Sequence, residues 1–232
     1  HPETSSQEDQ SLIEAYSRQR PKDGRDKVRS RDFHQDRFMI QPILFTAPHE
    51  EKKAERLKKH CLNLDGTELL QIRLPEEPKH LVYPSIANFS FLHCCEVMAG
   101  DPFVWLECDS IPLKQDWLKK LTETWIANGK KTLLTKDKHS PFDLCTGIGI
   151  WTKDVYRKIP RSIAEPDTKI GFDGYTFREL FGKYATTEQI QHIYAEYNNA
   201  GKAYPLDFPR CSWMIRESTL IFHADKEQKL IK

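Results

Sequence analysis

Apolar and polar positions along the chain follow two periods, one typical of β-strands and one typical of α-helices. Apolar runs of strand length recur, and between them apolar residues return every three or four positions. The apolar runs predict strands at 38–46, 68–75, 102–113, 131–135, 146–152 and 218–223. The helical spacing predicts helices at 49–64, 83–100, 115–129, 173–185 and 186–201.

Strands that alternate with helices predict an α/β fold built on a doubly wound, mainly parallel sheet. In such folds, ligands bind in a crevice at the carboxyl ends of the strands. The globular pattern begins at Phe38, whereas residues 1–37 are polar and interrupted by Pro and Gly. We therefore expect an N-terminal arm over 1–37 and a single α/β domain over 38–232.

The composition is that of a soluble globular protein. Of 232 residues, 35 are Lys or Arg and 34 are Asp or Glu, so the net charge of +1 by itself indicates neither a nucleic-acid nor a membrane partner. No apolar stretch approaches the ~20 residues that cross a bilayer. The six cysteines lack metal-ligand spacing, and we expect mostly buried thiols in a reducing compartment. These features predict a cytoplasmic protein, in the host cytoplasm if it is viral. Because the chain opens on His1, the sequence leaves open whether an upstream leader was removed.

Two carboxylates stand near the carboxyl end of the apolar run 103–106. On an extended chain, the side chains of Glu107 and Asp109 project to the same side. Carboxylate oxygens suit Mg²⁺ or Mn²⁺, which keep positions open for phosphate oxygens. The alternative is a solvated acidic turn.

The last expected strand carries a second set of polar residues. His223 ends the run 218–223, and Lys226 follows three residues later. An imidazole is a metal ligand, and a Lys ammonium can face a phosphate. A lone His is more often a surface or core residue. The pairing with the acids at another strand end favours a shared site, because strand ends converge in this kind of sheet.

Taken together, these segments resemble the nucleotide-sugar glycosyltransferases of the GT-A fold. The resemblance covers about residues 38–232 and rests on 105–113 (WLECDSIPL) with Trp117, 146–150 (TGIGI), 172–173 (FD) and 223–226 (HADK). It implies a GT-A-like domain. Glu107 departs from the Asp-x-Asp motif of that family, which affects the role of Glu107 more than that of Asp109.

The resemblance implies a metal-dependent enzyme that moves a sugar from a nucleoside diphosphate sugar, a UDP-sugar first of all, to a hydroxyl group. Asp109 and His223 would bind Mn²⁺ or Mg²⁺, and Glu107 would contact the ribose or a metal-bound water. Lys226 would face the diphosphate, where the negative charge of the leaving group develops.

Other positions are implied at the donor site. Thr46, Ala47 and Pro48, at the end of the first strand, would cradle the nucleoside. Asn88 is a candidate for a base or ribose contact, with a helix-surface amide as the alternative.

Four further residues have a functional and a structural interpretation. Gly147 and Gly149 would let the backbone approach the donor sugar or the acceptor, or would only relieve a tight strand. Asp173 is a candidate general base for the acceptor hydroxyl, or a helix N-cap. His192, on the helix expected over 186–201, faces either the core or the acceptor.

The sequence leaves the identity of the acceptor open. The chain is short for this fold, which favours a large or surface-presented acceptor. Residues 18–37 contain eight basic and four acidic side chains, so they could neutralise phosphates, although a solvated arm is the default for such a segment. Small bacteriophage enzymes that add sugars to hydroxymethylated bases are similar in kind, which makes DNA a candidate acceptor and partner.

Two other functions stay open. A nucleotidyltransferase also holds a metal and a nucleotide on a doubly wound sheet, but it normally has a Gly-rich phosphate loop after the first strand, and residues 46–49 form no such loop. A non-catalytic nucleic-acid-binding module would use the arm and would not need Asp109.

Overall fold

The computed structural model describes residues 40–74, 80–98, 102–135, 147–192, 215–223, 228, 230 and 231. Contacts divide the chain into two units, His1–Arg37 and Phe38–Lys232, and everything below concerns the second. The arm expected over 1–37 lies outside the described residues, so the division into an arm and one domain stays a prediction.

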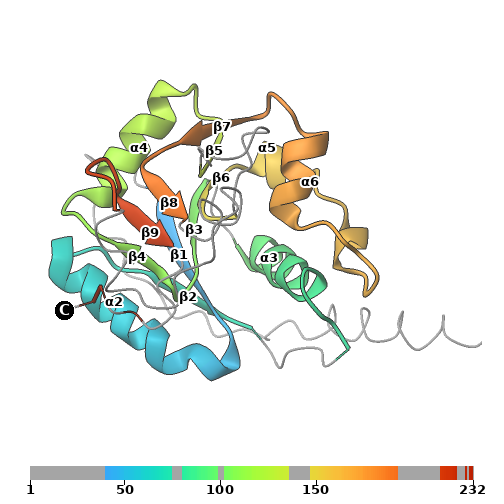
Figure 1. The fold of residues 1–232 in the computed structure, drawn as a ribbon, viewed down its shortest axis with the longest axis horizontal. Coiled ribbons are helices and arrows are strands. Elements are labelled where there is room, and N and C mark those ends of the chain that lie inside the picture. The colour runs from blue at the N-terminus through green and yellow to red at the C-terminus, as the bar shows by residue number, and fades with distance from the viewer. Residues whose placement is uncertain are drawn as a thin grey trace, which may run out of the picture. The chain divides into compact units, whose positions relative to one another are not determined.

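A six-stranded sheet forms the centre of the second unit (Figure 1), in the order β2-β1-β3-β6-β5-β7. Strand β1 pairs in parallel with β2 and β3, and β5 pairs in parallel with β7. Only β6, among these six, runs antiparallel to its neighbours β3 and β5. The strands are β1 (Gln41–Thr46), β2 (Leu70–Arg73), β3 (Phe103–Leu106), β5 (Thr132–Thr135), β6 (Gly149–Trp151) and β7 (Tyr184–Thr187). The mainly parallel α/β sheet predicted from the sequence is confirmed.

Helices cover both faces of this sheet. Figure 1 shows α3 and α6 side by side on one face and α2 on the opposite face. Helix α2 buries Ala54, Leu57 and Cys61 and ends at Asp65, and its C-cap is Gly66, whose φ of 81° suits a residue without a Cβ. The helices are η1 (Pro48–Glu50), α2 (Glu51–Asp65), α3 (Ser85–Val97), α4 (Trp117–Ala127), α5 (Lys153–Tyr156), η2 (Arg161–Ala164) and α6 (Phe172–Glu179). None of the helices in the described part of the chain combines the length and apolar character that a bilayer crossing requires.

A second sheet of three short strands adjoins the first in Figure 1, in the order β4-β9-β8. Strand β4 (Ser110–Pro112) pairs antiparallel with β9 (Ile221–His223), and β9 pairs in parallel with β8 (Ile190–His192). The register sets Ser110 opposite His223. The sequence predicts β9 but not its membership of a separate sheet.

The helix expected over 186–201 is wrong in its described part, where β7 ends at Thr187 and β8 follows. Gln191 is fully buried, and its Oε1 accepts hydrogen bonds from Thr219 Oγ1 (2.8 Å) and Arg216 N (3.1 Å). Parallel pairing with β9 holds 190–192 as a strand, these side-chain bonds add to it, and together they override the local helical spacing. The helix expected over 173–185 ends early for a similar reason, because Tyr184 already pairs with β5.

An aromatic cluster fills the space between α3, α6 and the sheet. Phe91 of α3 stacks on Phe172 of α6 with ring centroids 4.0 Å apart, and it also contacts Trp105 and Trp151. Such contacts add to the burial of large apolar surfaces. Since Trp105 lies two residues before Glu107 and Phe172 one residue before Asp173, the cluster fixes where these two acids leave the core.

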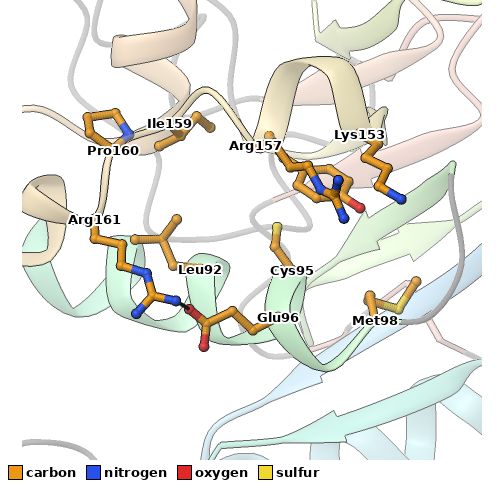
Figure 2. Close-up of a pocket in the computed structure, with 10 residues that line it drawn as sticks. Leu92, Cys95, Glu96, Met98, Lys153, Arg157, Ile159, Pro160 and Arg161 are labelled. Carbon is orange, nitrogen blue, oxygen red and sulfur yellow. Dashed lines mark ion pairs between the residues drawn. The ribbon is translucent and has the colours of Figure 1, made fainter. Parts of the chain in front are cut away.

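A pocket of about 530 Å³ opens between α3 and the segment 153–161 (Figure 2). Leu92, Cys95 and Met98 are among the residues that line it, and Arg161 pairs with Glu96 at 2.7 Å. The pocket lies near the amino end of β3, because its wall residue Tyr156 contacts Phe103. It shares no residue with the site described next.

Candidate metal centre

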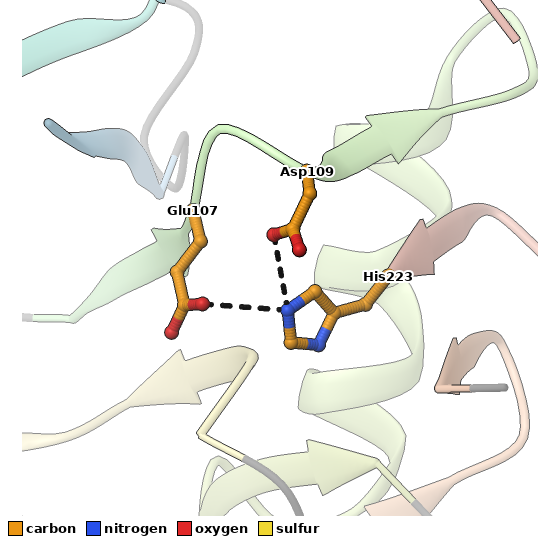
Figure 3. Close-up of side chains that lie close together, drawn as sticks. All are labelled: Glu107, Asp109 and His223. Atoms are coloured by element: carbon orange, nitrogen blue, oxygen red, sulfur yellow. Dashed lines mark ion pairs between the residues drawn. The ribbon is translucent and has the colours of Figure 1, made fainter. Parts of the chain in front are cut away.

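Two carboxylates and one imidazole meet at the carboxyl end of β3 (Figure 3). Nε2 of His223 lies 3.2 Å from Oδ1 of Asp109 and 3.4 Å from Oε2 of Glu107. One possible ligand atom from each residue lies within 4.8 Å of the other two. Three residues that the sequence singles out in two distant segments therefore form one cluster.

The cluster forms because the turn after β3 leads directly into β4. Within this turn, Ser110 N–H donates to the carbonyl of Glu107 (2.9 Å), and Glu107 N–H donates to Ser110 Oγ (3.2 Å). The pairing of Ser110 with His223 then brings the imidazole next to Asp109. A further bond orients Glu107, because Trp105 Nε1–H donates to its Oε1 at 3.3 Å.

Burial and charge have opposite effects on the pKa values of Asp109 and His223. The exposed fraction of the side chain is 10% for His223, 17% for Asp109 and 41% for Glu107. Burial favours the neutral form of Asp109, but the adjacent His223 outweighs it and lowers the pKa of Asp109. Burial likewise disfavours the imidazolium, but Asp109 and Glu107 outweigh it and raise the pKa of His223. The cluster therefore favours a positive charge between the two carboxylates.

The donor set fits a divalent cation. Carboxylate oxygens are the ligands that Mg²⁺ and Mn²⁺ prefer, and a neutral imidazole adds a nitrogen donor. A cation bound by Asp109, Glu107 and His223 would replace the proton that His223 Nε2 carries between the two acids. Three protein donors leave positions of an octahedral shell for phosphate oxygens.

Asp173 lies in the first turn of α6 and is half-buried. Its Oδ1 accepts a hydrogen bond from Gly174 N–H at 2.7 Å. Burial raises the pKa of Asp173, and the charge of Glu107 raises it further, so the two carboxylates are within electrostatic reach. The N-cap interpretation is wrong, because the N-cap of α6 is Gly171.

The carboxyl end of β1 lies beside the turn 107–109 between β3 and β4, here called the acidic turn because it carries Glu107 and Asp109. Cys108 Sγ, in the middle of the turn, is 3.8 Å from the carbonyl oxygen of Phe45. Thr46 ends β1, and Ala47 and Pro48 lead into η1. Thr46 Oγ1 accepts a hydrogen bond from Gln71 Nε2 at 3.2 Å. The segment expected to cradle the nucleoside is thus at the same edge of the sheet as the cluster.

Asn88 is buried and bonded to the protein backbone, which argues against both the expected nucleotide contact and the alternative of a helix-surface amide. Its side chain is fully buried, and Nδ2 donates to the carbonyls of Ile163 (2.6 Å) and Ile170 (2.9 Å). Its Oδ1 accepts the N–H of Phe172 at 2.6 Å. Because backbone groups use both ends of the amide, Asn88 ties α3 to the segment before α6.

Packing explains why glycine occupies positions 147 and 149. A Cβ at Gly149 would overlap the carbonyl oxygen of Leu133 in the neighbouring strand β5, and a Cβ at Gly147 would overlap the ring of Phe172. The structural interpretation, close approach of a neighbour, therefore explains both positions, and a donor contact is not needed. Lys226 lies outside the described residues.

Two residues near the site were missed or misplaced by sequence reasoning. His192 ends β8, and its ring contacts that of His223 edge-on, with centroids 4.3 Å apart. The strand 190–192 buries both Ile190 and Gln191, so no alternation of apolar and polar residues marks it in the sequence. Gln228 bonds to the acidic turn from a distant part of the chain, and no local pattern marks it.

No protein-family model and no curated protein sequence matches the chain. Among solved structures, the apo-form glycosyltransferase GlyE of Streptococcus pneumoniae TIGR4 is similar, with a TM-score of 0.52 and 12% identity over 80% of this chain and 54% of GlyE. The chain thus spans about half the length of GlyE. Two others are a glycosyltransferase involved in glycosylation of the major capsid of PBCV-1 (TM-score 0.49, 13% identity, 79% of this chain and 93% of that chain) and the galactosyltransferase LgtC in complex with donor and acceptor sugar analogues (0.47, 9%, 80% and 87%). At such identities the likeness concerns the fold alone, and the fold of the described residues is that of the GT-A-type glycosyltransferases.

Proposed function

We propose that the protein is a glycosyltransferase that takes a sugar from a nucleoside diphosphate sugar and depends on a divalent metal. The observation that carries this proposal is the convergence of Glu107, Asp109 and His223 at the carboxyl edge of a GT-A-type sheet. That edge is where α/β sheets bind their ligands.

The chemistry of the site matches the difficulty of the reaction. As the sugar leaves, negative charge develops on the diphosphate, and a divalent cation supplies the charge that stabilises it. Asp109 and His223 would hold Mn²⁺ or Mg²⁺. Glu107, oriented by Trp105, would be a third ligand or a ribose contact. Lys226 is proposed to face the diphosphate.

The donor is proposed to be a UDP-sugar, with Thr46, Ala47 and Pro48 around its nucleoside. This part of the proposal is supported by the position of the β1 end next to the acidic turn. The nucleoside would then lie beside the residues that hold its diphosphate.

Asp173 is proposed as the general base for the acceptor hydroxyl. Its raised pKa makes it a better proton acceptor near neutral pH than an ordinary Asp. A hydroxymethylated base in DNA is the candidate acceptor, and this step depends only on the basic segment 18–37.

The test is hydrolysis of a panel of nucleotide sugars with Mn²⁺, with EDTA, and with added acceptors that include hydroxymethylated DNA. Asp109→Asn and His223→Gln are expected to lower metal-dependent hydrolysis by about 100-fold or more. Glu123→Gln and His80→Gln, both at exposed positions, are the matched controls. Full activity in EDTA would contradict the metal, and transfer of a nucleotidyl group instead of a sugar would indicate a nucleotidyltransferase.

A further inference from the structure

We infer that Gln228 is a positioning residue that holds the turn between β3 and β4 in the geometry in which its acids meet His223. This inference deepens the proposed function and rests on it. It concerns how the cluster is kept together and not which groups bind the metal.

Gln228 is fully buried, and its Nε2 donates two hydrogen bonds. One goes to the carbonyl of Cys108 at 2.8 Å and the other to the carbonyl of Lys53 at 2.7 Å. Cys108 lies between Glu107 and Asp109, so the first bond holds the turn at its middle. Both acceptors are carbonyl oxygens, which cannot donate, so only the N–H groups of the amide can make this pair of bonds.

The backbone of Gln228 is held as well. Its carbonyl oxygen accepts a hydrogen bond from Arg56 Nη2 at 3.3 Å, and its φ of 53° is left-handed, which non-glycine residues rarely adopt. Such a conformation persists where the surroundings impose it, often at functional sites. Lys53 and Arg56 both belong to α2, so one helix anchors the residue that holds the turn.

The amide oxygen of Gln228 argues against a role that only stabilises the fold. Oε1 of Gln228 is buried and has no hydrogen-bond partner among the described residues. An unpaired buried acceptor lowers stability, and an apolar side chain would avoid that loss. An apolar residue could not make the two hydrogen bonds to Cys108 and Lys53, and these bonds are what the amide provides.

Gln228 follows His223 by five positions, so one stretch of chain contributes to the cluster twice. Pairing of β9 with β4 holds His223 opposite Ser110, and Gln228 holds Cys108. The turn is therefore fixed on both sides by residues that follow β8. This arrangement keeps the carboxylates and the imidazole at ligand distance from one another.

The test measures Mn²⁺ affinity directly, by electron paramagnetic resonance on folded protein well below its melting temperature. Gln228→Met keeps the length of the side chain and removes both donors, and it should weaken Mn²⁺ binding about 10–100-fold, as loss of ligand-orienting partners does. Thr132→Val is the matched control, because it removes a buried 2.7 Å bond to Thr152 at the amino end of β5. It should lower the melting temperature and leave Mn²⁺ affinity unchanged.

The outcomes separate the two claims. A wild-type protein that neither binds Mn²⁺ nor hydrolyses nucleotide sugars overturns the proposed function. Wild-type binding that Gln228→Met retains in full overturns the positioning role and leaves the function intact. If Gln228→Met does not fold, Arg56→Met releases only the backbone anchor and should weaken Mn²⁺ binding in the same direction; unchanged affinity in that variant overturns the inference.

Discussion

Nε2 of His223 lies 3.2 Å from Oδ1 of Asp109, although the two residues come from opposite halves of the chain. The pairing of β4 with β9 creates this contact, and the raised pKa of His223 follows from it. A metal ion that binds His223 must therefore displace a proton.

Binding of Mn²⁺ at pH 7.5 should release about one proton per ion, because metal ligands bind in their deprotonated form. Calorimetry in buffers that differ in ionisation enthalpy measures this number. His223→Gln should lower it toward zero. A wild-type release of zero protons would contradict the raised pKa of His223.

The stability of the metal-free protein should fall as the pH rises from 6.5 to 8.5. The folded-state pKa of His223 is raised above its ordinary value of 6.5, so its contribution to stability is fully present below pH 6.5 and is lost as the pH rises through the raised value. Asp109→Asn removes the main charge that raises this pKa and should flatten the profile. Melting temperatures of both proteins in EDTA measure the difference; parallel profiles would contradict the prediction.

Trp105→Phe should weaken Mn²⁺ binding several-fold, because Glu107 loses the hydrogen bond that orients it. Trp117→Phe is the matched control: Trp117 is equally buried, but its Nε1 has no partner among the described residues. Both variants should lose stability through the smaller ring. Equal Mn²⁺ affinities in the two variants would rule out an orienting role for Trp105.

Asn88→Ala should lower the free energy of unfolding by about 2–5 kcal/mol, because it leaves several buried backbone groups without partners. Urea unfolding measures the loss, and Asn63→Ala, at an exposed position of α2, should change it little. Below its melting temperature the Asn88→Ala variant should still bind nucleoside diphosphates. A selective loss of nucleotide binding with unchanged stability would restore the nucleotide-contact interpretation.

Asp173→Asn should lower kcat by at least about 100-fold and leave the donor Kd unchanged, as expected of a general base. Asp154→Asn is the matched control, since Asp154 occupies the first turn of α5 as Asp173 does that of α6. Single-turnover kinetics and donor titration separate the two quantities. Loss of donor binding together with kcat would assign Asp173 a structural role in α6.

The sequence predicts the strands that end at the site, because buried strands and the polar residues after them are local patterns. Glu107 and Asp109 follow an uninterrupted apolar run, and His223 ends another. Such patterns do not reveal strand partners. Strand β9 lies outside the main sheet and pairs with β4. This pairing depends on the register between distant segments, which no local spacing encodes.

The same limit explains the errors at Asn88 and over 186–192. Asn88 looks like a helix-surface amide from its neighbours in sequence, but its partners lie more than 70 positions away. Residues 190–192 carry helical spacing, yet parallel pairing with β9, about 30 positions away, holds them as a strand. The role of Gln228 could not be predicted from the sequence for the same reason, since both acceptors of its amide are backbone atoms far along the chain.

The indole of Trp105 stacks on Phe45 at 5.3 Å and points its N–H at Glu107. Emission of an indole shifts with the electric field along its ring, so a divalent ion bound at the Glu107 carboxylate would shift the emission wavelength of Trp105. If the cluster binds the ion, the emission of Trp105 would report its occupancy in real time without any label.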